Sequence, residues 1–337
     1  MTIYDVAHEA GVSVATVSRV LNNTAPVSPK TKQKIMTVIE KYQFQRNALA
    51  RSLKKKETRT LGIILPDITN PFFPEVFSGI ELEARENDYT LFLCDTMGEY
   101  ERETQYLYML RERQVDGIVF LGGRINLSKV EQNLAEELQT FAQRVPTVLV
   151  NGSIPGNPIH RVCVDEGAGT EQAVRHLLAL GHTDIAFIGG LEYMTTTMQK
   201  IRAFKKVFRE HGLTVRKEWI LYDDFSLNAG KRQMKKLLHM SHKPTAVLCV
   251  NDYTAVGAIQ EAGRRGYSIP NDISIIGFDD VPLATAILPE VTTVSQKTEL
   301  LGRTAISILH KLIQKEKVKK LTVIEPELII RESTAQL

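Results

Sequence analysis

Hydrophobic residues recur at helical spacing near the start of the chain. Residues 3–10 carry an apolar stripe, and Thr2 and Asp5 have capping-box spacing, so we expect a first helix there. Gly11 permits the left-handed backbone of a tight turn, and Ser13 is a good N-cap for a second helix. Two short helices joined by such a turn have helix-turn-helix spacing, in which the second helix enters the major groove of DNA.

A third apolar stripe and a short helical patch follow. Ser28 is a good cap and Pro29 suits the first helical position, where its missing N–H costs nothing, so we expect a third helix and one small core. Residues 47–53 form a patch too short to stay helical alone in water, and the basic residues 54–56 come next. We expect this patch to fold only against DNA and a partner copy, although an ordinary basic linker would read the same way.

From Thr60 onward the pattern changes to short apolar runs separated by longer amphipathic stretches. Strands that alternate with helices indicate parallel sheets buried on both faces, and the loop at 151–159 is the clearest break, so we expect two doubly wound lobes. Ligands collect at the carboxyl ends of such strands. The expected strands are 61–65, 90–94, 117–121, 147–150, 161–164, 185–189, 246–250 and 273–277.

The composition agrees with this interpretation, and the net charge differs between the N-terminal residues and the rest of the chain. The 337 residues, 43% hydrophobic and 24% charged, are typical of a globular protein with two or three domains. Residues 1–60 carry eleven Lys and Arg against four Asp and Glu, a net charge of +7, whereas the remainder carries 31 against 35, a net −4. Cationic side chains that neutralise phosphates release counterions, so the head suits a polyanion, with a solvated charged surface as the plainer interpretation.

The sequence lacks the motifs that are typical of several other classes of protein. The three cysteines are far apart, no apolar run approaches a membrane span and no signal peptide is apparent, so we expect a cytoplasmic protein without metal, cofactor or membrane partner. Gly167 and Gly169 follow a strand as in a dinucleotide-binding loop, but Gln172 occupies the third glycine position. P-loop, zinc-protease and nucleophile-elbow motifs are absent from the sequence, so we expect no catalytic residues.

Blocks of residues along the whole chain match one known pattern. They are 2–7 (TIYDVA), 11–13 (GVS), 16–22 (TVSRVLN), 47–53 (NALARSL), 61–66 (LGIILP), 70–73 (NPFF), 115–118 (VDGI), 180–182 (LGH), 244–246 (PTA), 251–252 (ND), 275–280 (IIGFDD) and 292–294 (TTV) with Gln296. In this order they resemble the LacI/GalR family of bacterial transcription regulators. The resemblance implies an all-α helix-turn-helix head joined to an α/β body of two doubly wound parallel-sheet lobes, like a periplasmic sugar-binding protein.

The resemblance also implies a domain plan and partners. A DNA-binding domain would span 1–46, a hinge helix and linker 47–60, and an effector-binding and dimerisation domain 61–337. Lobe one would take about 61–160 plus 293–322, and lobe two about 161–292 plus 323–337. The implied partners are a pseudo-palindromic operator in double-stranded DNA, a second copy of the chain, and a small-molecule effector, a sugar or sugar derivative, between the lobes. Repression is the usual outcome in the family.

For the DNA contacts, the resemblance makes Leu53 the hinge leucine that wedges between base pairs in the minor groove. Val14 and Ala15 would meet thymine methyl groups, while Thr16 and Arg19 would reach a base or a phosphate. Helix packing is an alternative role for Val14. The remaining implied contacts are Thr2, Tyr4, Ser18, Asn22, Asn47, Ala50 and Lys54.

For the effector contacts, the resemblance points to residues after the strands. Asn70, Phe72 and Phe73 follow the first strand, and the rings would stack on an apolar ligand face. Lys200 stands where the family usually has arginine, and a lysine is a point charge rather than a bidentate fork. Asp279 would accept hydroxyl hydrogen bonds, although a turn role for Asp279 and a core role for Phe225 stay open. The other implied contacts are Asn151, Asp165, Phe225 and Asn251.

Two departures and two alternatives accompany this interpretation. Residues 43–47 read QFQRN where the family has Gly-Tyr-x-Pro-Asn, so the hinge lacks the fixed φ of proline. The sequence ends without a heptad tail, so a dimer is expected rather than a tetramer. We expect effector binding to favour one arrangement of the lobes and thereby change the spacing of the hinges. The alternatives are control by a protein corepressor, and a cytosolic sugar-binding protein without a DNA role.

Overall fold

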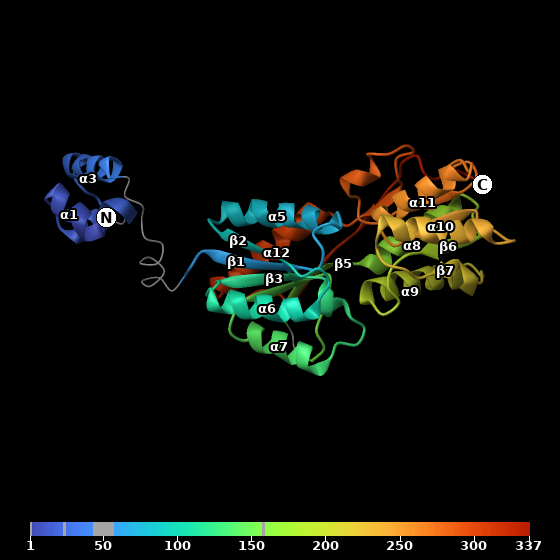
Figure 1. Ribbon diagram of the computed structural model, residues 1–337, viewed down its shortest axis with the longest axis horizontal. Helices are drawn as coiled ribbons and strands as arrows, with labels where there is room; N and C mark the ends of the chain where they lie inside the picture. Colours follow the sequence, from blue (N-terminus) through green and yellow to red (C-terminus); the bar gives the residue numbers. More distant parts are fainter. Residues whose placement is uncertain (1, 23–24, 43–56, 157–158) are drawn as a thin grey trace. The chain divides into compact units, whose positions relative to one another are not determined.

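The computed structural model describes residues 2–22, 25–42, 57–156 and 159–337 (Figure 1). The chain divides into two compact units, Met1–Thr58 and Arg59–Leu337, which we call the head and the body. The predicted hinge contacts Asn47, Ala50, Leu53 and Lys54 lie outside the described residues.

The head contains three helices at the positions that the sequence predicts, α1 (Ile3–Ala10), α2 (Val14–Asn22) and α3 (Pro29–Lys41), within its described residues. The Thr2 side chain accepts a hydrogen bond from the Asp5 N–H, the Asp5 carboxylate accepts one from the Thr2 N–H, and Gly11 has φ +64°. The capping box and the left-handed turn are therefore confirmed. The helices close a small core of Val6, Ala7, Ala10, Val17, Ile35 and Val38.

The first lobe of the body is a parallel sheet of six strands among the described residues, in the order β11-β5-β4-β3-β1-β2. Helices cover both faces, with α5 and α12 on one face and α6 and α7 on the other (Figure 1). The elements are β1 (Thr60–Leu65), α5 (Phe72–Glu86), β2 (Thr90–Asp95), α6 (Tyr100–Glu112), β3 (Gly117–Leu121), η1 (Gly123–Asn126), α7 (Gln132–Ala142), β4 (Thr147–Val150), β5 (His160–Val164), α12 (Thr298–Ile313) and β11 (Leu321–Ile324).

The second lobe is a smaller parallel sheet in the order β7-β6-β8-β9. Helices α10 and α11 pack on one face, and α8 and α9 on the other. The elements are α8 (Glu166–Ala179), β6 (Ile185–Ile188), α9 (Thr195–Glu210), η2 (Lys217–Trp219), β7 (Ile220–Leu221), α10 (Leu227–His239), β8 (Ala246–Cys249), α11 (Asp252–Arg264), β9 (Ser274–Ile276) and η3 (Pro282–Ala284). The predicted class, an α-helical head joined to two doubly wound lobes, is confirmed.

The strand pairings correct the predicted limits of the lobes. β5 pairs with β4 and β11 in the first sheet, so residues 161–164 and 323–324 belong to lobe one and not to lobe two. β10 (Thr293–Ser295) pairs with β12 (Glu327–Ile329) outside both large sheets, and Ser295 bridges to Asp279 of lobe two. The Pro- and Gly-containing loop before β5 marks a turn, but a turn does not reveal which sheet the next strand joins.

Helices α5 and α12 approach so closely that only glycine fits between their backbones. A Cβ on Gly302 would lie 2.2 Å from the Val76 carbonyl oxygen, whereas a Cβ on Gly263 of α11 would meet nothing within 4 Å. We expect Gly302→Ala to lower the free energy of unfolding by about 1–3 kcal/mol through overpacking. Gly263→Ala should instead raise it by about 0.5–1 kcal/mol, because it removes a flexible residue from a helix. Urea titrations of both variants test this, and a neutral Gly302→Ala would contradict the close contact.

Two absences hold for the described segments of the chain. No helix there combines the length and apolar character that a bilayer span requires. No group of three or more His, Cys, Asp or Glu side chains there is arranged to hold a metal ion.

Candidate ligand cavity and nucleic-acid interface

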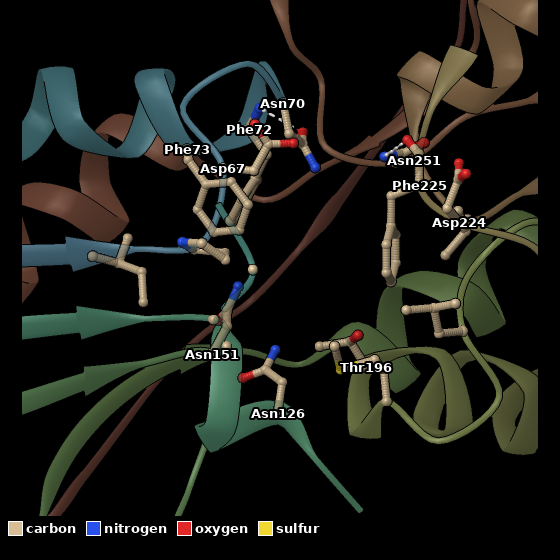
Figure 2. A pocket seen from close by; sticks show the side chains of 18 of the residues that line it. Asp67, Asn70, Phe72, Phe73, Asn126, Asn151, Thr196, Asp224, Phe225 and Asn251 are labelled. Atoms are coloured by element: carbon tan, nitrogen blue, oxygen red, sulfur yellow. Dashed lines mark hydrogen bonds between the residues drawn. The ribbon is translucent and has the colours of Figure 1, made fainter. Parts of the chain in front are cut away.

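A cavity of about 710 Å³ lies between the two lobes of the body (Figure 2). Its walls come from the segments that follow the carboxyl ends of strands in both sheets, where open α/β folds bind ligands. The structure therefore brings together residues that are more than two hundred positions apart in the sequence. The predicted effector contacts that line the cavity are Asn70, Phe72, Phe73, Asn151, Lys200, Phe225, Asn251 and Asp279.

Asp165 is the predicted effector contact that does not line the cavity. Its side chain is exposed and caps α8, accepting a hydrogen bond from the Ala168 N–H at 2.9 Å. The next residue, Glu166, is buried and lines the cavity instead. The sequence pointed to Asp165 because it directly follows a strand, whereas in the structure the next acidic residue along the helix is the one that lines the cavity.

Aromatic rings form the two side walls. Phe72 and Phe73 meet edge to face with centroids 5.3 Å apart, and the Asn70 side chain accepts a hydrogen bond from the Phe72 N–H at 3.2 Å, which fixes the turn into α5. Phe225 lies on the opposite wall, so that Phe73 and Phe225 face the space from different lobes (Figure 2). Such walls suit a ligand with apolar faces and a polar edge.

A chain of amide and carboxyl groups crosses the floor of the cavity. The Asn151 side chain of lobe one donates to Gln296 Oε1 at 2.9 Å, and Gln296 Nε2 donates to Asp279 Oδ1 of lobe two at 2.6 Å. Gln296 belongs to a segment that connects the lobes and was not among the predicted contacts, although it ends one of the sequence blocks quoted above. A ligand on this floor would touch a hydrogen-bond chain shared by both lobes.

Asp279 is buried at the end of that chain. Burial raises the pKa of Asp279 to about 7, while Lys200 and the hydrogen bond from Gln296 act in the opposite direction. The carboxyl group is therefore close to its point of half-ionisation at neutral pH. It can accept a hydrogen bond when ionised and donate one when protonated.

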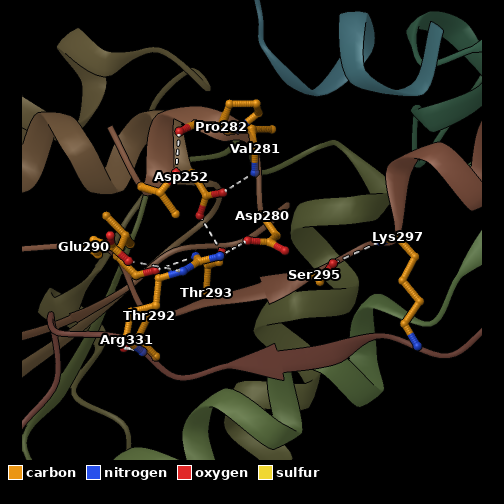
Figure 3. A network of polar contacts seen from close by, with 12 residues as sticks. Asp252, Asp280, Val281, Pro282, Glu290, Thr292, Thr293, Ser295, Lys297 and Arg331 are labelled. Carbon is orange, nitrogen blue, oxygen red and sulfur yellow. Dashed lines mark hydrogen bonds and ion pairs between the residues drawn. The ribbon is translucent and has the colours of Figure 1, made fainter. Parts of the chain in front are cut away.

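A polar network surrounds Asp280 and Val281, the residues that follow Asp279 (Figure 3). The backbone of this loop is left-handed. Asp279 has φ +113°, and Asp280 after it has φ +61°. Arg331 donates to the Asp280 carboxylate at 2.5 Å, and buried Asp252 accepts from the Val281 N–H at 2.9 Å. Burial raises the pKa of Asp252 well above its usual range. These contacts supply the support that non-glycine residues need at positive φ.

A buried arginine supports the lobe-one wall and was not foreseen from the sequence. Arg124 in η1 is fully buried, as is its partner Glu103, and η1 ends at Asn126, which lines the cavity. Within the described residues the buried Asn126 Oδ1 has no hydrogen-bond partner. The guanidinium donates to Glu103, Glu137, Thr104 and the carbonyl groups of Tyr100 and Leu134.

The two lobes also touch directly, beyond the segments that connect them. The Ser128 N–H donates to the Tyr193 carbonyl oxygen at 2.9 Å, and Leu127 and Met194 form an isolated antiparallel bridge. Residues 127–128 follow η1 of lobe one, and residues 193–194 precede α9 of lobe two. We call this contact the 127–194 bridge. Because Met194 also lines the cavity, the bridge forms part of the cavity wall.

Four of the predicted DNA contacts in the described part of the head are exposed. Tyr4 is 70% exposed, and Thr2, Ala15 and Arg19 are exposed. Thr16 and Ser18 are half-buried, and the Thr16 hydroxyl shares a hydrogen bond with Ser13 at 2.8 Å.

Val14 and Asn22 stand apart from the other head residues. Val14 is half-buried against the head core, so it contributes to packing, the alternative role considered above. The side chain of Asn22 lies outside the described part of the head.

Comparisons with known proteins agree with this architecture. Residues 2–47 match the family described as "Bacterial regulatory proteins, lacI family", and residues 174–334 match the "Periplasmic binding protein-like domain". The chain is 37% identical over 340 residues to the HTH-type transcriptional regulator DegA of Bacillus subtilis (strain 168), with 100% of this chain and 98% of that protein covered.

Solved structures extend the agreement to three dimensions. The lac repressor dimer bound to operator and the anti-inducer ONPF matches with a TM-score of 0.88 and 26% identity over 99% of each chain. A LacI family transcriptional regulator from Enterococcus faecium with bound ribose matches with a TM-score of 0.72 and 30% identity, covering 82% of this chain and 99% of that one. These relatives are regulators and not enzymes. The chain belongs to the lacI family of bacterial regulatory proteins and is a DNA-binding transcriptional regulator.

Proposed function

We propose that this regulator is a homodimeric repressor in the cytoplasm that binds a pseudo-palindromic operator and changes its operator affinity when a sugar or sugar derivative occupies the cavity. Residues 1–46 serve as the DNA-binding domain, 47–60 as the hinge and 61–337 as the effector-binding and dimerisation domain, with the lobe limits corrected above. The cavity between the lobes is the observation that carries this proposal. It combines apolar ring walls with a polar floor, the combination that hydroxyl-rich ligands require.

The relatives support both halves of the proposal. The lac repressor neighbour is a dimer with operator DNA and an anti-inducer, and the Enterococcus faecium neighbour holds ribose. In the described part of the chain, β2 is one of the two outer strands of the first sheet, and its Phe92 and Leu93 are 37% and 43% exposed; the other outer strand is β11. Unpaired strand edges with apolar side chains favour association, so a second copy would cover this strand.

On the DNA side, the proposed major-groove contacts are the exposed side chains of α2 and the residues around the start of α1. Arg19 is exposed and cationic, so it suits a guanine edge or a phosphate. The proposed minor-groove contact is Leu53 with its neighbours in the hinge. Within the cavity, the proposed ligand contacts are Asn70, Phe72, Phe73, Asn151, Lys200, Phe225, Asn251 and Asp279, together with Asn126 and Gln296.

The test begins with a palindromic duplex selected from a randomised pool by the full-length protein. We expect Arg19→Ala to weaken binding to that duplex by about 1–3 kcal/mol, roughly five- to 150-fold, if Arg19 reads a base. Lys34→Ala, which removes an exposed positive charge from α3, is the matched control and should keep most of the affinity. Fluorescence anisotropy measures both variants, with and without candidate sugars. A wild-type protein that prefers no selected duplex over random fragments would refute the proposal.

A further inference from the structure

More acidic than basic side chains line the cavity. Within the described part of the chain, Lys200 is the one cation among the lining residues. The lining acidic residues are Asp67, Asp95, Glu166, Asp224 and Asp279. Asp224 also forms an ion pair of 3.1 Å with Arg232, which does not line the cavity. For the other four acidic residues, Lys200 is the one cation in the described lining. An added negative charge would therefore enter a site that already holds several acidic groups.

The charge of Lys200 is already engaged by its neighbours. Lys200 Nζ lies 3.4 Å from Glu166 Oε2, and the two side chains are each 5% exposed. The same ammonium sits over the Phe278 ring, 3.9 Å from its centroid. Opposite charges at this separation attract strongly when water is largely excluded, so the Glu166 carboxylate occupies the position in which Lys200 would otherwise hold a ligand anion.

The floor offers acceptors that still need donors. Within the described residues the buried Glu166 Oε2 accepts no hydrogen bond, although it is ion-paired with Lys200. The hydrogen bond that Asp279 accepts from Gln296 goes to Oδ1. An unmatched buried acceptor costs free energy until a donor reaches it. Ligand hydroxyl or ammonium groups supply such donors, whereas phosphate and carboxylate groups bring further acceptors.

The anion-binding ends of several nearby helices are also occupied. The Asn70 side chain accepts from the first N–H of α5, Asp165 caps α8, and Asn251 caps α11 by accepting from the Thr254 N–H at 2.9 Å. Side-chain caps of this kind use the backbone donors that otherwise attract phosphates. The ends of α5, α8 and α11 therefore offer few free donors to an anion, whereas α9, whose Met194 and Thr196 line the cavity, begins without a side-chain cap.

We infer that Glu166 is a specificity-determining residue, which pairs with Lys200 and restricts the cavity to hydroxyl-rich ligands that are neutral or carry an amino group, excluding their phosphate esters and acids. The inference rests on the proposed function, because it names the class of ligand for the same cavity. It also assigns a role to the lysine that replaces the usual arginine. Lys200 neutralises Glu166 and holds it in the floor, and ligand donors complete the coordination of the carboxylates.

The experiment uses the full-length protein and matched probes. Glucose, galactose and mannose are each tested as the free sugar, the 2-amino sugar, the 6-phosphate and the uronic acid, by thermal shift and then calorimetric titration. For the wild type, we expect the free or amino sugar of the best-bound skeleton to bind at least about tenfold more tightly than its phosphate or acid, since like charges in a desolvated site are costly. A phosphate or acid as the tightest ligand would overturn the inference while leaving a ligand-controlled regulator intact.

The variant pair separates the role of Glu166 from general effects. In Glu166→Gln, the ratio of the affinity for the free or amino sugar to the affinity for its phosphate or acid should fall at least about fivefold. Lys200 is then no longer paired with a carboxylate and can bind an anion. The control is Glu171→Gln, because Glu171 lies on the same helix and forms only the partly exposed pairs with Arg175 and Lys206. This variant should keep the wild-type ratio of the two affinities. Both variants must keep their operator binding without ligand, which checks folding. An unchanged ratio in Glu166→Gln would overturn the inference, and failure of every probe to bind the wild type would overturn the proposed sugar effector together with it.

Discussion

Replacing Arg124 by methionine will lower the free energy of unfolding of the body by about 3–5 kcal/mol, because the substitution leaves a buried carboxylate without its partner. Glu103 is 1% exposed, and its carboxylate accepts from both the side chain and the backbone N–H of Arg124. Burial already raises the pKa of Glu103, while Arg124 acts against that shift. Without the guanidinium, Glu103 must take up a proton or the lobe must open to water.

Denaturant titration followed by circular dichroism, supported by calorimetry, measures this loss. Arg102→Met is the matched control, since Arg102 pairs with Glu99 at the surface, with side chains 39% and 54% exposed, and should change stability by less than about 1 kcal/mol. The double variant Arg124→Met with Glu103→Met should recover at least about half of the loss, because replacing a whole buried pair is far less costly than breaking one. A loss below about 1 kcal/mol in Arg124→Met would contradict the structural role assigned to this side chain.

Arg124 also shows why the sequence predicts the strands of the lobes better than the burial of individual polar side chains. Buried parallel strands appear as short apolar runs, so β1 to β6, β8 and β9 could be located from hydrophobicity alone. Nothing in the local pattern marks Arg124 as buried, because a charged side chain in a polar loop is ordinarily exposed. Its burial depends on acceptors from α6 and α7, which only the tertiary fold brings together.

The limits of the lobes and the floor of the cavity depended on the same non-local information. β7, β10, β11 and β12 were not predicted. Their two to four residues give little pattern to recognise, although the three-residue β9 was located within the apolar run 273–277. Asp165 and Glu166 are neighbours with similar chemistry, and only the course of α8 decides which of them faces the cavity. By contrast, the place of Phe73 and Asp279 in the cavity wall could be predicted, because both lie in the segments after strands and match the family pattern.

A disulfide across the 127–194 bridge will hold the two lobes together without a ligand, so the effect of the lobe arrangement on operator affinity can be measured apart from ligand binding. In an antiparallel pair, opposite residues that exchange no backbone hydrogen bonds have Cα atoms about 4.5 Å apart, within the range of about 4.4–6.8 Å that a disulfide spans. Leu127 and Met194 are such a pair, because the flanking bond runs from the Ser128 N–H to the Tyr193 carbonyl. Leu127→Cys with Met194→Cys, once oxidised, should therefore hold the lobes in the present arrangement.

The expected result is a redox-dependent operator affinity. If the arrangement of the lobes sets that affinity, the oxidised and reduced forms of the double variant should differ by about five- to 150-fold in operator Kd, the range of ordinary allosteric coupling. The oxidised form should also stop responding to effector. Each single variant serves as a control, and the native Cys94, Cys163 and Cys249 should not interfere, because burial raises the pKa of each thiol and disfavours the reactive thiolate. Equal operator affinity in the two redox states, with the disulfide verified by mass spectrometry, would mean that closure at this bridge is not the motion that DNA binding senses.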